Sequence, residues 1–268
     1  MATPNNNNGT KITLYWLEQS RSQRILWLLE ELNLAYDLKI FKRGSDYLAP
    51  PELKQIHPLG KSPVITLEPP GTSSKPFVLA ESAVIVEYLC EHFNGREKKL
   101  IPAKYGDGDT STTKEGKEDA VVGAESEEYM RYRYFMHYAE GSLMPFLVMQ
   151  LVMDRVKEAP VPFFIKFIPQ FVASQVEKAF LTRNIFAHFD FLENQLHTAP
   201  GGGPFFCGKE LTAVDIMLSF PLIAAQTRVP VGDKYPLLTG YVDRLQNMEG
   251  YKKAVQKVDE VEGSVAAI

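Results

Sequence analysis

The 268-residue chain has few cysteines, no long apolar run and no excess of positive charge. Two cysteines, Cys90 and Cys207, are too few for a disulfide framework, and Cys90 falls inside a helical pattern, so we expect a reducing compartment, most simply the cytosol. No stretch approaches the roughly 20 uninterrupted apolar residues that a membrane-spanning helix needs. The net charge of -4 argues against a protein that binds nucleic acid mainly through phosphate contacts.

Motifs for several kinds of reaction site are missing as well. The sequence contains no metal-ligand cluster, phosphate-binding loop or serine-hydrolase elbow, and most of its histidines stand apart without ligand spacing: His92, His137, His188 and His197. We therefore expect neither a metal site nor a permanently bound cofactor. The first residues, MATPNNNNGTK, lack the apolar core of a secretory signal, and we expect residues 1–10 to form a flexible polar tail.

What the sequence does contain divides into two unlike halves. Residues 11–96 alternate strand and helix patterns, which indicates a small α/β domain with a mixed sheet. Residues 97–125 have the composition of a linker or surface loop, and residues 126–268 show only helical patterns, so we expect an all-helical second domain. The expected strands are 12–17, 36–42, 64–68 and 77–80, and the expected helices are 22–32, 52–56, 82–93, 126–156, 166–196, 213–225, 237–248 and 251–258.

Four segments, in this order, resemble a known family: SRSQRILWLLEELNLAYDL, HPLGKSPVI, LAESAVIVEYL and LTAVDIMLSFPL. Together they are similar to the glutathione transferases of the serine type. The run APPELKQIHPLGKSP looks most like the fungal transferases typified by the yeast enzyme associated with the endoplasmic reticulum. The resemblance implies a thioredoxin-like glutathione-binding domain followed by a helical domain, with glutathione as co-substrate, a hydrophobic electrophile as second substrate and a homodimeric assembly.

Ser20 is the residue that we expect to carry the chemistry. A free thiol has a pKa of about 8.5 and only the thiolate is a good nucleophile, so the protein must favour the charged form. A hydroxyl donor beside a helix N-terminus can do this, and Ser20 lies where the first strand gives way to the first helix. Taken alone, Ser20 and Gln23 also fit a capping box, a role compatible with catalysis. Ser22 and Tyr15 are the rival hydroxyls.

The resemblance assigns two parts of glutathione to the segment before the third strand. Pro63 would follow a cis peptide bond, which leaves the backbone of Ser62 to pair with the cysteinyl part of glutathione. Without the resemblance a trans bond would be expected. Lys61 would meet the glycine carboxylate. His57 stands where many relatives carry asparagine, and this departure weakens its assignment to glutathione binding.

Two helix starts complete the set of motifs. Glu81 and Ser82 open the helix at residue 82, with Ser82 as its N-cap. In the family they would bind the ammonium and the carboxylate of the γ-glutamyl group, because a zwitterion needs one partner of each kind. Thr212 and Asp215 form a second capping box, which we expect to be structural rather than catalytic.

The aromatic helix expected from residue 126 is assigned mostly to the core or to a dimer interface. By resemblance, Arg131, Tyr132 and Phe135 are candidates for the electrophile pocket. The segment 159–172, APVPFFIKFIPQFV, is expected to pack between helices, and the alternative is a patch that contacts a membrane or an apolar substrate. Weak peripheral association with a membrane such as the endoplasmic reticulum therefore stays open beside a cytosolic location.

These features predict an enzyme that joins glutathione to hydrophobic electrophiles. Because such catalysis rests on stabilising and positioning a thiolate, the same site is also expected to reduce organic hydroperoxides, in detoxification and oxidative-stress defence. The alternative is a non-catalytic glutathione-binding or protein-interaction module with the same fold. The presence of Ser20, the Ser62-Pro63 pair and the Glu81-Ser82 pair favours the enzyme.

Overall fold

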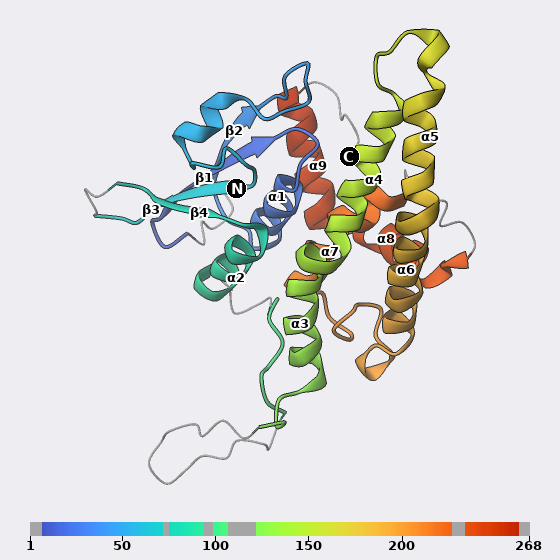
Figure 1. Cartoon of the computed structure of the whole chain (residues 1–268). Helices are drawn as coiled ribbons and strands as arrows, with labels where there is room; N and C mark the ends of the chain where they lie inside the picture. The colour runs from blue at the N-terminus through green and yellow to red at the C-terminus, as the bar shows by residue number, and fades with distance from the viewer. Residues whose placement is uncertain (1–6, 72–74, 94–98, 107–121, 227–233, 263–268) are drawn as a thin grey trace.

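The computed structural model describes residues 7–71, 75–93, 99–106, 122–226 and 234–262. Its N-terminal half is a four-stranded sheet with helices α1 and α2 on one face (Figure 1). The strand order is β2-β1-β3-β4, in which β1 and β2 run parallel and the other two pairs are antiparallel. The elements are β1 (Lys11–Leu17), α1 (Ser22–Glu31), β2 (Asp37–Phe41), the 3-10 turn η1 (Pro51–Gln55), β3 (Val64–Glu68), β4 (Phe77–Ala80) and α2 (Ser82–Phe93).

Alternation along β1 places two apolar sets on opposite faces of the sheet. The set that packs into the main core with α1 is Ile12, Leu14 and Trp16. The set on the other face consists of Tyr15 and Leu17, which pack with Val64 of β3 and Leu53 of η1. The η1 segment therefore covers part of the face that α1 leaves open.

The described part of the C-terminal half is helical (Figure 1). Two of the long helices that the sequence predicts, 126–156 and 166–196, are each interrupted by a π-helical turn, at Ala139–Leu143 and Glu177–Leu181. A π turn changes the helical register, so the side chains beyond it face a different direction. The elements are α3 (Glu127–Tyr138), α4 (Met144–Lys157), η3 (Phe163–Ile165), α5 (Phe167–Val176), α6 (Thr182–His197), η5 (Pro200–Gly202), α7 (Ala213–Gln226), α8 (Pro236–Gln246) and α9 (Glu249–Glu262).

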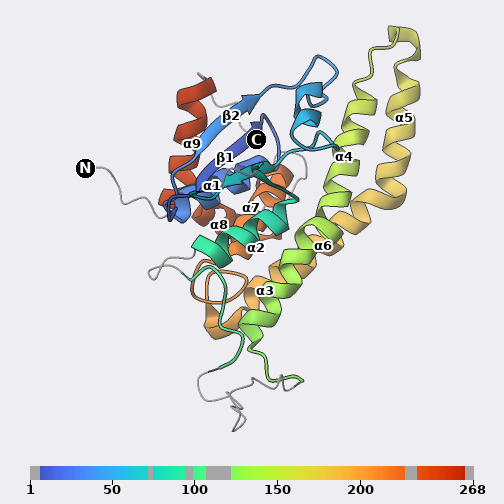
Figure 2. The same cartoon turned by 90° about the vertical axis from the view of Figure 1, so that its left-hand side faces the viewer.

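The last helix, α9, packs on the first domain. It lies against α1 (Figures 1 and 2), and the rings of Trp27 and Tyr251 meet edge to face with 5.3 Å between their centroids. Trp27 Nε1 also donates a hydrogen bond to Glu31 Oε2 at 3.2 Å. The sequence pattern predicts a helix over residues 251–258. The structure extends this helix at both ends and uses it to close the core around α1.

Residues 7–10 correct the expectation of a flexible tail over residues 1–10. The side-chain amide of Asn7 is buried and donates to the carbonyl oxygens of Thr10 and Ala35, while its oxygen accepts from the N–H of Ala35. These bonds tie the chain before β1 to the chain before β2, so residues 7–10 belong to the fold. Residues 1–6 lie outside the described residues.

The linker expected over residues 97–125 is described only at its two ends. Residues 97–98 and 107–121 lie outside the described residues. Leu100 does not behave as a linker residue, because it is buried in the core and its carbonyl accepts from the N–H of Ala213 at 2.9 Å. The second half of the chain is therefore anchored to this segment at the start of α7.

The segment 159–172 does not pack between helices as the sequence pattern predicts. The α4–α5 hairpin extends beyond the other helices (Figure 2). Four phenylalanines within this segment are between 63% and 89% exposed: Phe163, Phe164, Phe167 and Phe171. The prediction was wrong because the hairpin extends past the helices that would have covered it. None of the helices in the described parts of the chain is both long and apolar enough to cross a membrane.

Gly250 is required by the close approach of α9 to α1. A Cβ atom at this position would lie 2.0 Å from Glu31 Oε2 and 3.0 Å from Trp27 Nε1. Any larger residue must therefore displace two side chains that bond to each other. We expect Gly250→Ala to lower the free energy of unfolding by about 1–3 kcal/mol, the usual effect of overpacking, as measured by chemical denaturation.

Gly240 in α8 is the matched control, because it is also helical and a Cβ atom there would meet nothing within 4 Å. Gly240→Ala should raise the free energy of unfolding by about 0.5–1 kcal/mol, since alanine loses less backbone entropy on folding. Equal effects of the two substitutions would contradict the packing of α9 on α1.

Candidate functional site

Strand pairing brings three segments of the chain to one edge of the sheet. Tyr15 in β1 pairs with Val64 at the start of β3, and Val64 pairs with Ala80 at the end of β4. The chain after β1, before β3 and after β4 therefore meets at the same end of the sheet. These segments carry the residues assigned to catalysis and glutathione binding: Ser20, His57, Lys61, Ser62, Pro63, Glu81 and Ser82.

Ser20 is buried, and its hydroxyl contacts Ser22 twice. The two Oγ atoms lie 2.6 Å apart, and Ser20 Oγ also accepts from the N–H of Ser22 at 3.2 Å. Ser22 Oγ donates to the carbonyl of Leu17 at 3.2 Å and accepts from its N–H at 3.3 Å. Because a hydroxyl has only one proton, Ser20 is the donor in the contact between the two serines when Ser22 donates to Leu17.

The capping box predicted from Ser20 and Gln23 is only half formed. Ser20 Oγ accepts from the N–H of Ser22, two residues further on, at 3.2 Å, which is the hydrogen bond that a capping side chain makes. Arg21 between them already has helical dihedral angles, with φ -62° and ψ -7°. The return hydrogen bond is missing, because the side-chain amide of Gln23 is buried without a hydrogen bond to any described residue.

The two rival hydroxyls lie in less suitable places. Ser22 has no exposed surface, and its hydroxyl is engaged by Leu17. Tyr15 is buried on the η1 face of the sheet, where its ring lies 6.4 Å from the ring of Phe41. The geometry thus favours Ser20 over both, with Ser22 as the residue that holds its hydroxyl.

The Ser62–Pro63 peptide bond is cis, as the family resemblance implies. The bond lies just before β3, and Ser62 Oγ donates to the carbonyl of Tyr15 at 3.1 Å, which ties this turn to β1. Lys61, the residue assigned to the glycine carboxylate, is exposed. Lys61 therefore presents its ammonium to solvent close to the cis bond.

His57 supports the same turn through its backbone. Its N–H donates to the carbonyl of Leu53 at 3.0 Å, and its carbonyl accepts from the N–H of Gly60 at 2.8 Å. The Nδ1 atom of His57 is buried and has no hydrogen bond to a described residue. These contacts shape the loop that carries Lys61.

Glu81 and Ser82 are displaced by one position from the predicted cap. The first helical residue of α2 is Ser82, and the carbonyl of Glu81 accepts from the N–H of Ile85 at 3.0 Å, so Glu81 and not Ser82 occupies the cap. Glu81 has a left-handed φ of +71°, uncommon for a residue other than glycine. Its carboxylate is exposed while Ser82 is buried, so the pair presents a charge and a helix N-terminus side by side.

The helical domain meets this edge of the sheet through Glu140, which the sequence analysis did not single out. Its carboxylate bonds Arg24 through Oε1 and lies 2.8 Å from Arg21 Nη1 through Oε2. Arg24 is fully buried and burial lowers the pKa of its guanidinium, an effect that Glu140 opposes. Because Glu140 lies in the π turn between α3 and α4, this contact places the start of α4 beside the start of α1.

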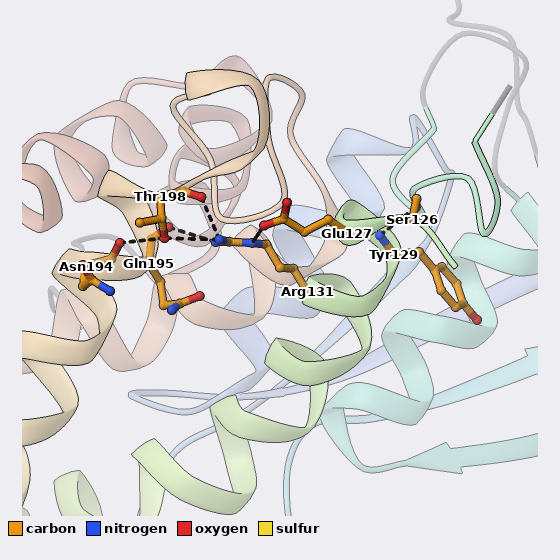
Figure 3. A network of polar contacts seen from close by, with 7 residues as sticks. All are labelled: Ser126, Glu127, Tyr129, Arg131, Asn194, Gln195 and Thr198. Carbon is orange, nitrogen blue, oxygen red and sulfur yellow. Dashed lines mark hydrogen bonds and ion pairs between the residues drawn. The ribbon is translucent and has the colours of Figure 1, made fainter. Parts of the chain in front are cut away.

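The three residues of α3 predicted for the electrophile pocket make structural contacts. Tyr132 and Phe135 are core residues with 2% and 0% of their surface exposed. Arg131 lies on α3 and binds the end of α6 (Figure 3). These contacts favour a role in packing, because α3 turns the apolar face that carries Tyr132 and Phe135 to the core.

Arg131 satisfies carbonyl groups that the end of α6 leaves without partners within the helix. Its Nη1 donates to the carbonyl of Gln195 at 3.0 Å and its Nη2 to the carbonyl of Thr198 at 2.7 Å, while Nε pairs with Glu127 at 2.8 Å (Figure 3). Thr198 Oγ1 donates in turn to the carbonyl of Asn194 at 2.9 Å. Arg131 therefore has a structural role, joining α3 to α6.

Asp215 at the start of α7 is a buried structural acceptor. Its Oδ2 accepts from the N–H of Thr212 at 2.7 Å and from Thr212 Oγ1 at 2.9 Å, and its Oδ1 accepts from Tyr241 at 2.8 Å. Burial raises the pKa of the Asp215 carboxyl, and these donors oppose the rise. In the capping box expected from the sequence, the Thr212 hydroxyl would accept from the backbone N–H of Asp215. Here the hydroxyl donates to the Asp215 carboxylate, and the carboxylate also accepts from the N–H of Thr212, which is the other half of the box.

Comparisons with known proteins agree with this fold and place the chain in a family. Residues 20–92 match the family model described as Glutathione S-transferase, N-terminal domain, and residues 170–244 match Glutathione S-transferase, C-terminal domain. The chain is 31% identical over 247 residues to Glutathione S-transferase 1 of Saccharomyces cerevisiae, a match that covers 92% of this chain and 94% of the relative.

Two solved structures extend the comparison. A glutathione S-transferase from Actinobacillus pleuropneumoniae is 29% identical with a TM-score of 0.63, covering 92% of this chain and 93% of that one. A glutathione transferase homologue from Sulfitobacter with bound glutathione shares the fold at 16% identity and a TM-score of 0.65, covering 92% and 98%.

A thioredoxin-like sheet domain followed by a helical domain is the fold that the sequence predicted, and it is confirmed. The chain belongs to the glutathione S-transferase family and is an enzyme of that class. Among the described residues, no group of three or more histidine, cysteine, aspartate or glutamate side chains could hold a metal ion.

The structural role of Arg131 can be tested directly. We expect Arg131→Ala to lower the free energy of unfolding by about 1–3 kcal/mol, because it leaves partly buried carbonyls of α6 without their charged donor. The KM for an electrophilic substrate should not change. Chemical denaturation and steady-state kinetics measure the two quantities.

Arg133 is the matched control for this substitution, since it lies on the same helix and is exposed. Arg133→Ala should change neither quantity. A large rise in KM for Arg131→Ala with unchanged stability would return Arg131 to the electrophile pocket.

Proposed function

We propose that this glutathione S-transferase activates glutathione through Ser20 and joins its sulfur to hydrophobic electrophiles. The observation that carries the proposal is the meeting of Ser20, the cis Ser62–Pro63 bond and the Glu81–Ser82 pair at one edge of the sheet. Each of the three supplies a different group that glutathione needs. Ser20 is the hydroxyl for the sulfur, and the other two hold the cysteinyl backbone and the γ-glutamyl end.

The hydrogen bonds around Ser20 suit a donor to a thiolate. When Ser22 donates to the carbonyl of Leu17, the proton of Ser20 points to Ser22 Oγ. When Ser20 turns its proton to a bound sulfur, Ser22 can donate to Ser20 Oγ while the N–H of Leu17 still donates to Ser22. Lowering the thiol pKa by one unit requires about 1.4 kcal/mol of preference for the thiolate. A charge-assisted hydrogen bond at the positive end of α1 is strong enough for this.

The remaining contacts separate glutathione's charges along the site. Lys61 receives the glycine carboxylate, and the backbone of Ser62 pairs with the cysteinyl unit, for which the cis bond turns the chain. The exposed carboxylate of Glu81 binds the ammonium, and the N-terminus of α2 with Ser82 binds the γ-glutamyl carboxylate. We assign His57 only the backbone support of this loop.

The electrophile is assigned to α4 in place of α3. Two contacts hold α4 beside the Ser20 loop: Glu140, just before α4, pairs with Arg21, and Arg155, near its end, stacks on the ring of Tyr47 at 3.7 Å from its centroid. Leu151 precedes Arg155 by four residues and so shares its face of the helix, where it is only partly buried. It gives this face an apolar group for a hydrophobic substrate.

Conjugation and peroxide reduction use the same thiolate. In conjugation the sulfur forms a bond to carbon, and a leaving group departs or the adduct takes up a proton. In peroxide reduction the sulfur attacks the terminal oxygen of a hydroperoxide and releases an alcohol. A second glutathione then forms the disulfide and water. We propose both reactions, in detoxification and oxidative-stress defence, with glutathione as co-substrate and no permanently bound cofactor.

We also propose a homodimer that meets at the β4 edge of the sheet. β4 has no further strand beside it among the described residues, and Phe77 and Val78 on it are 48% and 38% exposed. Val84 on α2 is 47% exposed. An exposed apolar edge strand invites pairing unless it is covered, and a second copy of the chain would cover it.

We place the enzyme in the cytosol, with the exposed phenylalanines of residues 163–171 supporting weak peripheral contact with a membrane.

The central test is Ser20→Ala. We expect kcat for conjugation of a chromogenic aromatic halide to fall on the order of a hundredfold, the effect of removing one donor to developing charge. Glutathione affinity, measured by titration calorimetry, should change little, because Lys61, Ser62, Glu81 and Ser82 hold the rest of the molecule.

Ser22→Ala should lower kcat by a smaller factor, since it removes only the partner of the Ser20 hydroxyl. An unchanged kcat for Ser20→Ala, with the loss appearing in Tyr15→Phe instead, would refute the assignment. Retention on immobilised glutathione without turnover of either the halide or cumene hydroperoxide would favour the non-catalytic binding module.

The dimer is tested by sedimentation equilibrium. The native chain should show twice its monomer mass of 30.2 kDa, and Val84→Glu should shift the equilibrium toward monomer because it buries a charge at the interface. Val122→Glu is the control, since Val122 is 99% exposed and belongs to no helix or strand. A native chain of monomer mass would contradict the proposal.

A further inference from the structure

Arg43 binds the loop that carries Ser20 from outside. Its Nε donates to the carbonyl of Glu18 and its Nη2 to the carbonyl of Gln19, both at 3.2 Å, while Nη1 donates to the carbonyl of Tyr47 at 2.9 Å. Glu18 and Gln19 directly precede Ser20 in the loop between β1 and α1. The guanidinium thus joins this loop to the loop after β2.

We propose that Arg43 is a positioning residue for the transferase reaction, which fixes the direction of Ser20 Oγ by holding the backbone of the β1–α1 loop. The proposal rests on the function proposed for Ser20. Arg43 donates to backbone carbonyls on both sides of its fork, so its role is to hold the loop, and Ser20 remains the group that would touch the sulfur.

The backbone of the loop needs such support. Gln19 has a left-handed φ of +46°, a conformation that a residue with a side chain adopts at a cost unless its surroundings hold it. The peptide unit between Gln19 and Ser20 is planar, so fixing the carbonyl of Gln19 also fixes the N–H of Ser20. Arg43 therefore sets the plane from which the Ser20 side chain projects.

The segment around Arg43 and the segment around Glu18 also bond in the opposite direction, so they are joined by more than the Arg43 side chain. Glu18 Oε1 accepts from the N–H of Arg43, and the N–H of Glu18 donates to the carbonyl of Phe41 at 3.2 Å. Five donors in a rigid plane suit an arginine for carbonyls in different directions, whereas a lysine ammonium would satisfy them less well. The experiment must therefore test the planar geometry of the Arg43 guanidinium separately from its charge.

The loop after β2 also contacts the second domain. Tyr47 has a left-handed φ of +61°, and its ring lies against the guanidinium of Arg155 on α4. Arg43 donates to the carbonyl of this same residue. Tyr47 therefore joins the loop after β2, which Arg43 ties to the Ser20 loop, to α4, the helix that we assign to the electrophile.

The first experiment compares Arg43→Lys and Arg43→Ala with Lys42→Ala in the full-length enzyme. Lys42 is the matched control, since it is the preceding residue and its side chain is exposed. We expect both Arg43 variants to lose about ten- to a hundredfold in kcat, as misplacement of a reacting group by a fraction of an ångström to one ångström does. The dissociation constant for glutathione should stay unchanged, and Lys42→Ala should match the native enzyme.

A pH profile separates positioning from a purely structural role. If Ser20 is misdirected, the pKa of the bound glutathione thiol rises, and the rising limb of kcat/KM shifts to higher pH. Ultraviolet absorbance of the thiolate at equilibrium measures the same pKa. Arg43→Lys keeps the charge, and thermal unfolding checks that it is folded. A native thiol pKa and native kcat in folded Arg43→Lys would overturn the proposal.

A double-mutant cycle with Ser20→Ala shows whether Arg43 acts through Ser20. In the Ser20→Ala background, Arg43→Lys should have no further effect on the thiol pKa. The same shift in both backgrounds would mean that Arg43 acts independently of Ser20, and would overturn the inference alone. A Ser20→Ala enzyme with native thiol pKa and native kcat would instead refute the proposed function of Ser20.

Discussion

The carboxylate of Glu140 is the contact on which the arrangement of the two domains depends. It bonds Arg24, whose side chain is fully buried, and it lies 2.8 Å from Arg21 at the start of α1. A buried guanidinium without a counter-charge would be strongly destabilising. Nε and Nη2 of Arg24 make no hydrogen bonds to described residues, so Glu140 and the face of the Phe220 ring at 5.4 Å are its main electrostatic partners. The π turn that carries Glu140 must therefore stay against α1.

The path of the second domain past α1 follows from this contact. The residues before the π turn belong to the core, as the burial of Tyr132 and Phe135 shows. The residues after it run past the start of α1 to Arg155, which meets Tyr47 of the first domain. On the opposite side of α1, α9 closes the core through Tyr251. Helix α1 is thus held by the second domain on two sides, and the loop at its start is held with it.

Sequence patterns predicted the bounds of a helix or strand well where residues that end such elements stand next to it. β3, β4 and α2 have the bounds that the sequence predicts, because prolines, a turn with proline, glycine and serine, and the Glu81–Ser82 pair mark their ends. The π turn at residues 139–143 has no such marker, so the break between α3 and α4 could not be predicted. The capping box at Ser20 was predicted only in part, because Ser20 Oγ accepts from the N–H of Ser22 while the Gln23 side chain makes no hydrogen bond to a described residue.

Long-range contacts were beyond the reach of these signals. Arg43 and Gln19 are 24 residues apart, and Arg24 and Glu140 are 116 apart. In the sequence each arginine is an ordinary charged residue, and only the fold reveals which acceptor it meets. The same holds for the phenylalanines of residues 163–171, whose exposure depends on how far the α4–α5 hairpin extends. The residues that would touch glutathione were therefore predictable from motifs, whereas the residues that hold them were not.

Residues that hold Ser20 matter because a single hydroxyl contributes little free energy to a thiolate. A neutral hydrogen bond has a net value of about 1 kcal/mol in a folded protein, and one to a charged partner about twice that. Such a donor favours a thiolate only if its proton points at the sulfur, because a freely turning hydroxyl also bonds water or a neighbouring oxygen. Ser20 is held at its side chain by Ser22 and at its backbone by the hydrogen bonds of Arg43. The contribution proposed for Ser20 therefore depends on Ser22, which belongs to the same motif, and on Arg43, which lies outside it.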